Sequence, residues 1–170
     1  MKKRFILVIL SFLLANALSA ETLYKVCPGI YLGGSSPALD SIEKKEILDF
    51  VTVGVDLQVG YGFTLFDAIS LSAYFNMGID TGLPNQPNIF YGGLAELLWG
   101  GGLLKYGIAL GGGYLTNIDI SIYNYETFYF RAAIPVIFLD LFKTSLCFDL
   151  YPDIGCRLGL LVHINTGVTR

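Results

Sequence analysis

The sequence predicts an all-β protein: an antiparallel up-and-down transmembrane β-barrel of about eight strands. Three observations lead to this fold class. Apolar and polar residues alternate along successive segments, short and long connections alternate between those segments, and the composition is unusually apolar. Of the 170 residues, 54% are hydrophobic and 15% are charged, and the mean hydropathy is +0.59. Soluble domains carry more charge on their surfaces, so an apolar environment is expected around this chain.

The first twenty residues have the three parts of a secretory signal peptide. Three basic residues stand at positions 2–4, an apolar run spans residues 5–14, and small residues follow. We expect cleavage after Ala17 or Ala20, which leaves residues 21–170 as the barrel domain. An uncleaved membrane anchor is the alternative, although the apolar run is short for a helix that crosses a bilayer.

Alternation is clearest in residues 49–63 and 69–80. In both segments the apolar side chains fall on one face of a strand, whereas a helix would scatter them around its axis. The pattern is weaker in six further segments, namely residues 22–33, 89–99, 104–114, 127–138, 143–150 and 155–165. Pro28 interrupts the first of these and is expected to cause a bulge or weakened pairing.

The connections between segments alternate in length. Three are tight, with the sequences TLFD, GGG and LDLF, and three others are longer: GSSPALDSIEKKEIL, DTGLPNQPN and TNIDISIYNYE. The last connection, at residues 151–153, is short and departs from the scheme. Short turns on one side and long loops on the other are typical of outer-membrane barrels, with the turns and both termini on the periplasmic side.

The apolar face carries aromatic residues near the strand ends. One predicted girdle contains Tyr24, Tyr61, Trp99, Tyr106 and Phe138, and the other contains Tyr91, Tyr114 and Phe128. Two aromatic girdles around a band of Val, Ile and Leu are typical of a surface that faces lipid. The alternative is a soluble sandwich or lipocalin-like barrel whose aromatic residues form the core.

This combination of strand pattern, loop asymmetry and signal peptide resembles the small bacterial outer-membrane barrels of the OmpA, OmpX and OmpW type. Residues 157–164 resemble the terminal β-signal that the barrel assembly machinery reads, with Gly159, Val162 and Ile164 at the glycine and hydrophobic positions. The segment departs from that signal by ending in Ile164 rather than in an aromatic residue. The resemblance implies an outer-membrane location, contact with outer-membrane lipid, and the assembly machinery as a partner during biogenesis.

Successive side chains of a strand alternate between its two faces, and this alternation, here called strand parity, predicts that seven charged side chains point into the lumen. They are Asp56, Glu96, Lys105, Arg131, Lys143, Asp149 and Arg157. Opposite charges inside a narrow barrel are expected to pair, because an unpaired buried charge is strongly destabilising. This interpretation makes the lumen a structural plug of salt bridges. The alternative is a narrow or gated path for small polar solutes.

His163 is the one histidine of the sequence and its obvious candidate base. Small barrels that act as lipid A acyltransferases or deacylases use a His with a Ser on the surface that outer-leaflet lipid reaches. His163 is predicted near the periplasmic end instead, and Ser35, Ser36 and Ser121 have no histidine partner. We therefore expect a structural histidine and no catalytic residue, so the protein is not expected to be an enzyme.

Cys27, Cys147 and Cys156 are predicted to be unpaired, since the first two face inward on non-adjacent strands and the third faces outward. Their spacing does not suggest a metal site, so no metal or cofactor is expected. Removal of the signal peptide leaves eight Lys and Arg against fourteen Asp and Glu, a net charge near −6. Nucleic acid is therefore not expected as a partner.

The predicted function is that of a monomeric outer-membrane protein with a structural or surface-interaction role and a mostly filled lumen. One alternative is a passive, porin-like channel for small or hydrophobic solutes, and a lipid-acting enzyme is a distant third. The loop at residues 116–126 is apolar for a solvated segment. It either extends its hairpin above the membrane or presents an edge to a cell-surface ligand that the sequence does not identify.

Overall fold

The computed structural model describes residues 22–37, 51–65, 68–82, 86–101, 103–117, 126–152 and 155–169. The predicted signal peptide and the connections at residues 38–50 and 118–125 lie outside the described residues. The strands are β1 (Thr22–Pro37), β2 (Val51–Leu65), β3 (Ile69–Gly82), β4 (Gln86–Gly101), β5 (Leu104–Asn117), β6 (Glu126–Phe138), β7 (Phe142–Tyr151), β8 (Gly155–Ile164) and β9 (Thr166–Thr169). None of the described residues belongs to a helix that could cross a membrane.

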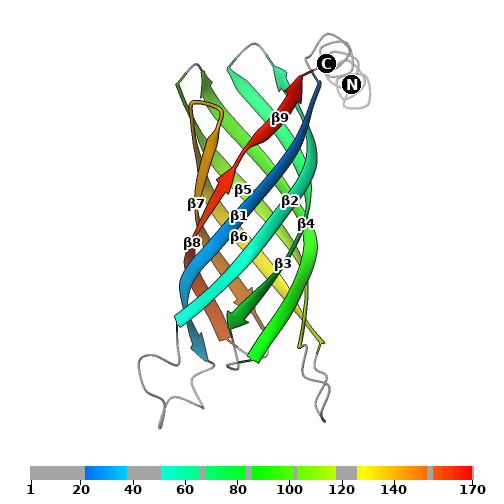
Figure 1. Cartoon of the computed structure of the whole chain (residues 1–170), viewed down its shortest axis with the longest axis vertical. Coiled ribbons are helices and arrows are strands. Elements are labelled where there is room, and N and C mark those ends of the chain that lie inside the picture. The colour runs from blue at the N-terminus through cyan, green and yellow to red at the C-terminus, as the bar shows by residue number, and fades with distance from the viewer. Residues whose placement is uncertain are drawn as a thin grey trace, which may run out of the picture.

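The strands form one closed antiparallel up-and-down barrel, which confirms the predicted all-β barrel architecture (Figure 1). Each strand from β1 to β7 pairs with the next along the chain, and β1 closes the circle by pairing with β2 on one side and with β8 and β9 on the other. β8 and β9 share one register against β1, from His163 opposite Gly29 to Thr166 opposite Val26. They therefore fill a single position in the wall, and the barrel has eight positions.

The stagger of the strands sets the width of the barrel. Pairing partners followed around the barrel from Lys25 on β1 lead to Arg157 on β8, which lies opposite Ser35, ten residues further along β1. Eight strands with a shear of ten are tilted by about 40° and leave an interior that side chains can fill.

The start of β1 and the end of β9 lie at one end of the barrel, here called the turn end (Figure 1). Tight connections join β2 to β3, β4 to β5 and β6 to β7 at this end. In the last of these, Leu139 and Asp140 have φ of 54° and 55°, the left-handed conformation that primed hairpin turns require. The opposite end, the loop end, carries the long connections at residues 38–50 and 118–125.

The prediction of one long loop is wrong. The segment DTGLPNQPN was expected to connect two strands, but β3 continues to Gly82 and β4 begins at Gln86, so that Gly82 and Gln86 are paired. Pairing continues because backbone groups at a strand end gain partners from the neighbouring strand. On the other side of β3, Thr81 holds the same strand end to β2 by donating a hydrogen bond from Oγ1 to the Val53 carbonyl, at 3.1 Å.

Pro28 interrupts the pairing of β1 with one of its neighbours, but it does not cause a bulge, which was the other expectation. The register between β1 and β2 runs through Pro28, which lies opposite Leu57. The interruption falls on the other side of β1, where Asn165 separates β8 from β9, because proline has no N–H to donate to that neighbour. Asn165 bonds elsewhere: its backbone N–H donates to the Leu141 carbonyl at 2.6 Å and its Nδ2 to the Asp140 carbonyl at 2.8 Å.

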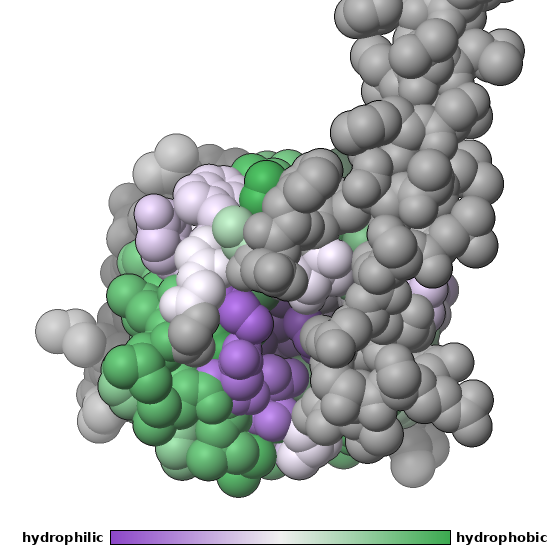
Figure 2. Space-filling model, turned by 90° about the horizontal axis from the view of Figure 1, so that it is seen from above, coloured by the Kyte–Doolittle hydropathy of each residue, from purple (hydrophilic) through white to green (hydrophobic). Residues whose placement is uncertain are grey.

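The apolar face of the strands points outward and the polar face points inward. Val55 on β2 is 56% exposed, while its neighbour Asp56 is buried. Figure 2 views the barrel from the turn end, with hydrophilic residues in the middle and hydrophobic residues on the outer side. The alternatives of a sandwich or a lipocalin-like barrel are therefore wrong, because both would bury the apolar face.

The predicted girdle residues with described side chains all point outward, and the side chain of Tyr24 lies outside the described part. Near the turn end, Trp99 and Tyr106 pack with ring centroids 6.0 Å apart. Near the loop end, Tyr114 packs against Tyr91 and Phe128, with centroids 6.0 and 5.5 Å apart. Tyr61 and Phe138 are also exposed. Tyr106 and Tyr114 are eight residues apart on β5, which corresponds to about 20 Å along the barrel axis for a strand tilted by about 40°.

The segment that resembles a β-signal forms β8. Gly159 pairs with Gly33 of β1, and both make room for the buried ring of Tyr31, which a Cβ atom at either position would meet. Val162 is half-buried, and Ile164 is exposed on the outer face. Glycine is therefore needed at position 159 for packing, whatever its role in assembly.

Candidate functional site in the barrel lumen

Six of the seven charged residues predicted for the lumen are buried inside the barrel. They are Asp56, Glu96, Arg131, Lys143, Asp149 and Arg157, and each is at most 3% exposed. The prediction that Lys105 joins them is wrong. Lys105 is the second residue of β5, so its side chain lies at the rim, where Nζ contacts Asp140 Oδ1 in the β6–β7 turn at 2.7 Å.

A first group of buried side chains, the loop-end cluster, consists of Asp80, Asn88, Arg131, Asp149 and Arg157. Arg131 holds Asp149 with two bonds, from Nε to Oδ1 at 2.7 Å and from Nη2 to Oδ2 at 3.0 Å. Arg157 donates to the same carboxylate from Nη2 at 2.6 Å and, through Nη1, to Asp80. Asp80 also accepts a hydrogen bond from Asn88 Nδ2 at 3.4 Å. This cluster joins β3, β4, β6, β7 and β8.

Aromatic rings surround the two arginines of the loop-end cluster. The Arg157 guanidinium lies 4.4 Å from the ring centroid of Tyr31 and 5.6 Å from that of Tyr151. The Arg131 guanidinium lies 5.4 Å from the centroid of Phe90. Arginine suits this setting because its planar, weakly hydrated group stacks on rings while it donates to carboxylates.

A second group, the turn-end cluster, consists of Lys25, Asp56, Gln58, Ser72, Tyr74, Glu96, Lys143 and His163. Lys143 Nζ lies 2.5 Å from Glu96 Oε2 and donates to Gln58 Oε1 at 3.0 Å. Gln58 Nε2 then donates to Asp56 Oδ2 at 3.2 Å, and the Tyr74 hydroxyl donates to Glu96 Oε1 at 3.0 Å. The cluster is thus a chain of contacts across the lumen.

His163 lies at one end of this chain. Its Nε2 is 2.6 Å from Asp56 Oδ2, and both side chains are fully enclosed. Nδ1 has no hydrogen-bond partner among the described residues. Of the serines considered as its partners, Ser35 lies near the other end of the barrel, and the side chains of Ser36 and Ser121 lie outside the described part.

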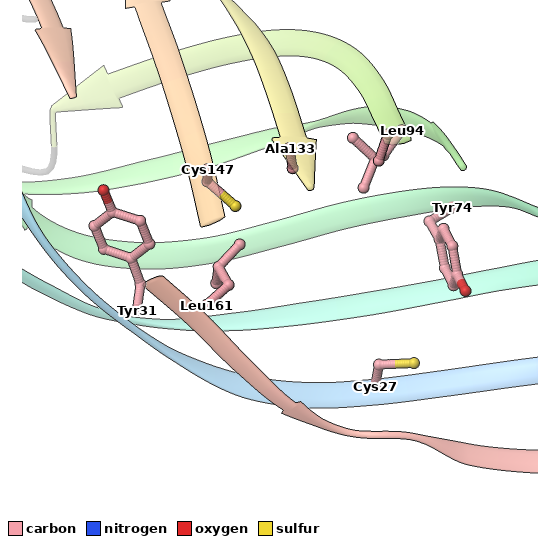
Figure 3. Close-up of a cluster of buried hydrophobic side chains, with 8 residues drawn as sticks. Cys27, Tyr31, Tyr74, Leu94, Ala133, Cys147 and Leu161 are labelled. Atoms are coloured by element: carbon pink, nitrogen blue, oxygen red, sulfur yellow. The ribbon is translucent and has the colours of Figure 1, made fainter. Parts of the chain in front are cut away.

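Largely apolar side chains lie between the two clusters, together with the buried polar residues Asn76 on β3 and Ser145 on β7. On β7, Cys147 lies between Lys143 and Asp149, and on β8, Leu161 lies between Arg157 and His163. Figure 3 shows both side chains pointing into the interior with Leu94, Ala133 and the ring of Tyr31. At the loop end, the space lined by Asp80, Asn88, Leu115, Tyr151 and Arg157 has no room for a water molecule.

Among the described residues, Asp80 and Lys25 are the buried charged residues that the lumen prediction missed. Parity contained the signal for both. Asp80 is on the polar face of its segment, and Lys25 stands between the apolar residues Tyr24 and Val26 of the alternating pattern. Both are buried, at 1% and 5% exposure. Strand parity does not predict which inward residues contact one another. Asp80 and Arg157, for example, are far apart in the chain.

The three cysteines are free, as predicted, with Cys27 and Cys147 buried and Cys156 half-buried. Cys27 Sγ donates to Asn165 Oδ1 at 3.3 Å. Among the described residues, no three His, Cys, Asp or Glu side chains are grouped as metal ligands. The described side chains of the lumen interact through paired charges and hydrogen bonds.

No family model matches this sequence, and no curated protein or solved structure is significantly similar to it.

Proposed function

We propose that this protein is an integral outer-membrane barrel that acts as a closed structural scaffold and presents its loops at the cell surface. One observation carries the proposal. The barrel is inverted relative to a soluble protein, with an apolar band between two aromatic girdles outside and neutralised charges inside. Such a surface is stable in hydrocarbon, where a closed barrel leaves no unpaired sheet edge.

The contents of the lumen support a scaffold rather than a channel. The described interior holds four carboxylates and four basic side chains, Lys25, Arg131, Lys143 and Arg157, and the side chains are in contact across the lumen. Largely apolar side chains lie between the clusters. A solute would have to separate buried ion pairs, which costs several kcal/mol per ion before new contacts form.

Single-channel recording on refolded protein in planar bilayers tests the closed lumen. We expect no reproducible unitary conductance from the full barrel. Stable, reproducible conductance steps would overturn the proposal of a closed scaffold and favour the alternative of a channel. Heat-modifiable gel migration together with a β-rich circular dichroism spectrum in detergent would check that the recorded protein is folded.

Arginine substitution on the outer face tests the membrane location. Val55 lies within the apolar band, and Val51 lies at the loop-end start of the same strand; both are exposed, at 56% and 48%. V55R should lower the free energy of unfolding in lipid vesicles by about 2–4 kcal/mol, and V51R by about 0–1 kcal/mol, because the cost depends on depth in the bilayer. Equal, small effects would contradict lipid exposure.

A further inference from the structure

Pairing between β5 and β6 is interrupted near the middle of both strands. The register passes from Tyr106 opposite Val136 to Ala109 opposite Ala133, and Gly107 and Ile108 have no partners between these pairs. Their counterparts in register are Pro135 and Ile134. Proline lacks an N–H, so it cannot donate to β5. On its other side, Pro135 remains paired with Ser145 of β7.

A groove of about 280 Å³ lies on the outer face beside this interruption. The side chains that line it are all Ala, Ile, Leu or Phe, and they include Ile108 and Ile134. The hollow exists because Ala132 lies between two large neighbours in register, Leu110 on β5 and Phe148 on β7. A small side chain in a row of large ones leaves a depression in the barrel surface.

The groove lies within the apolar band of the barrel. On β5, Ile108 and Leu110 lie between the girdle residues Tyr106 and Tyr114. A smaller groove of about 180 Å³ continues on the other side of Ile108 and Leu110, beside Ala95 on β4. The occupant of this surface must therefore be hydrocarbon, because it is reached from the membrane interior under the proposed function.

We propose that the groove beside Pro135 binds an acyl chain of a membrane phospholipid. A chain seated there touches walls on several sides, which gives it more dispersion contacts than the convex surface elsewhere. It would also cover backbone groups at the interruption, which water cannot reach at that depth. This inference rests on the proposed membrane location, and it adds a preferred lipid position on the barrel.

Photolabelling with phospholipid tests the groove. The full barrel is refolded into phosphatidylglycerol and phosphatidylethanolamine vesicles that contain a trace of phosphatidylcholine with a diazirine in its acyl chain. Labelled peptides are mapped by mass spectrometry after irradiation. We expect labelling to concentrate on residues 108–110 and 132–134. A132F, which fills the groove, should reduce that labelling severalfold, whereas A73F on the outer face of β3 should leave it unchanged.

The possible outcomes separate the site from the membrane location. Equal labelling of all strands would overturn the groove but leave a membrane barrel, whereas absence of label from every strand would overturn both proposals. A third outcome is that every outer surface except the groove is labelled and that A132F changes the sedimentation of the protein. This would overturn the proposal that lipid occupies the groove and would favour a second copy of the chain. If A132F does not fold, A132L provides the smaller filling side chain, and unchanged labelling would contradict the site.

Discussion

The two charged clusters of the lumen balance their charges in different ways. In the loop-end cluster two arginines meet two aspartates, and Arg157 contacts both carboxylates. In the turn-end cluster Lys143 pairs with Glu96, but Lys25 has no ion-pair partner among the described residues and donates to Ser72 Oγ at 3.1 Å. A guanidinium has five donors in a plane, whereas an ammonium acts as a point charge. The arginine cluster is therefore the more tightly connected.

Asp149→Asn should have the largest effect, because Asp149 is the carboxylate that both arginines share. Loss of its charge leaves Arg131 without an ion-pair partner in the described lumen. The free energy of unfolding should fall by about 3–5 kcal/mol, the usual cost of breaking a buried pair. Urea unfolding in lipid vesicles measures this value. A loss below that of the turn-end variants would contradict the comparison.

Lys143→Met should have a smaller effect in the turn-end cluster. The substitution keeps the volume but leaves Glu96 without its closest cation. Glu96 retains the hydrogen bond from the Tyr74 hydroxyl, so the cost should be about 2 kcal/mol, between that of a lost hydrogen bond and that of a broken buried pair. The same unfolding assay applies. A cost equal to that of Asp149→Asn would show that the two clusters are equally interdependent.

His163→Gln should cost less again, about 1 kcal/mol, since an amide can still donate to Asp56. Asp56 also keeps its contact with Gln58. His163→Leu is the matched variant that removes the donor, and it should cost more than His163→Gln. If the two variants unfold alike, the contact between His163 and Asp56 does not stabilise the barrel.

Lys105→Ala should have the smallest effect. Its partner Asp140 has a side chain that is 56% exposed at the rim, so the pair is solvated. We expect the free energy of unfolding to change by less than about 1 kcal/mol, as for other surface pairs. A loss comparable to that of Lys143→Met would place Lys105 in the turn-end network after all.

Strand ends and connections were the least predictable parts of the fold. Composition and alternation predicted the barrel and the face of each strand, because a side-chain period of two follows from strand geometry. They did not predict that β3 and β4 would pair as far as Gly82 and Gln86. Pairing depends on the neighbouring strand, which a local pattern does not contain. The interruption at Pro135 was also missed, although the proline itself was visible in the sequence.

Parity alone decided that Asp56, Arg131, Asp149 and His163 face inward, because successive side chains of a strand alternate between the two faces of the sheet. The tertiary structure decided which of them meet. Partners across the lumen are set by the stagger and tilt of the closed barrel, which bring Asp56 to His163 and Asp80 to Arg157. The same stagger leaves Lys105 at the rim and buries Lys25, although both were inward by parity.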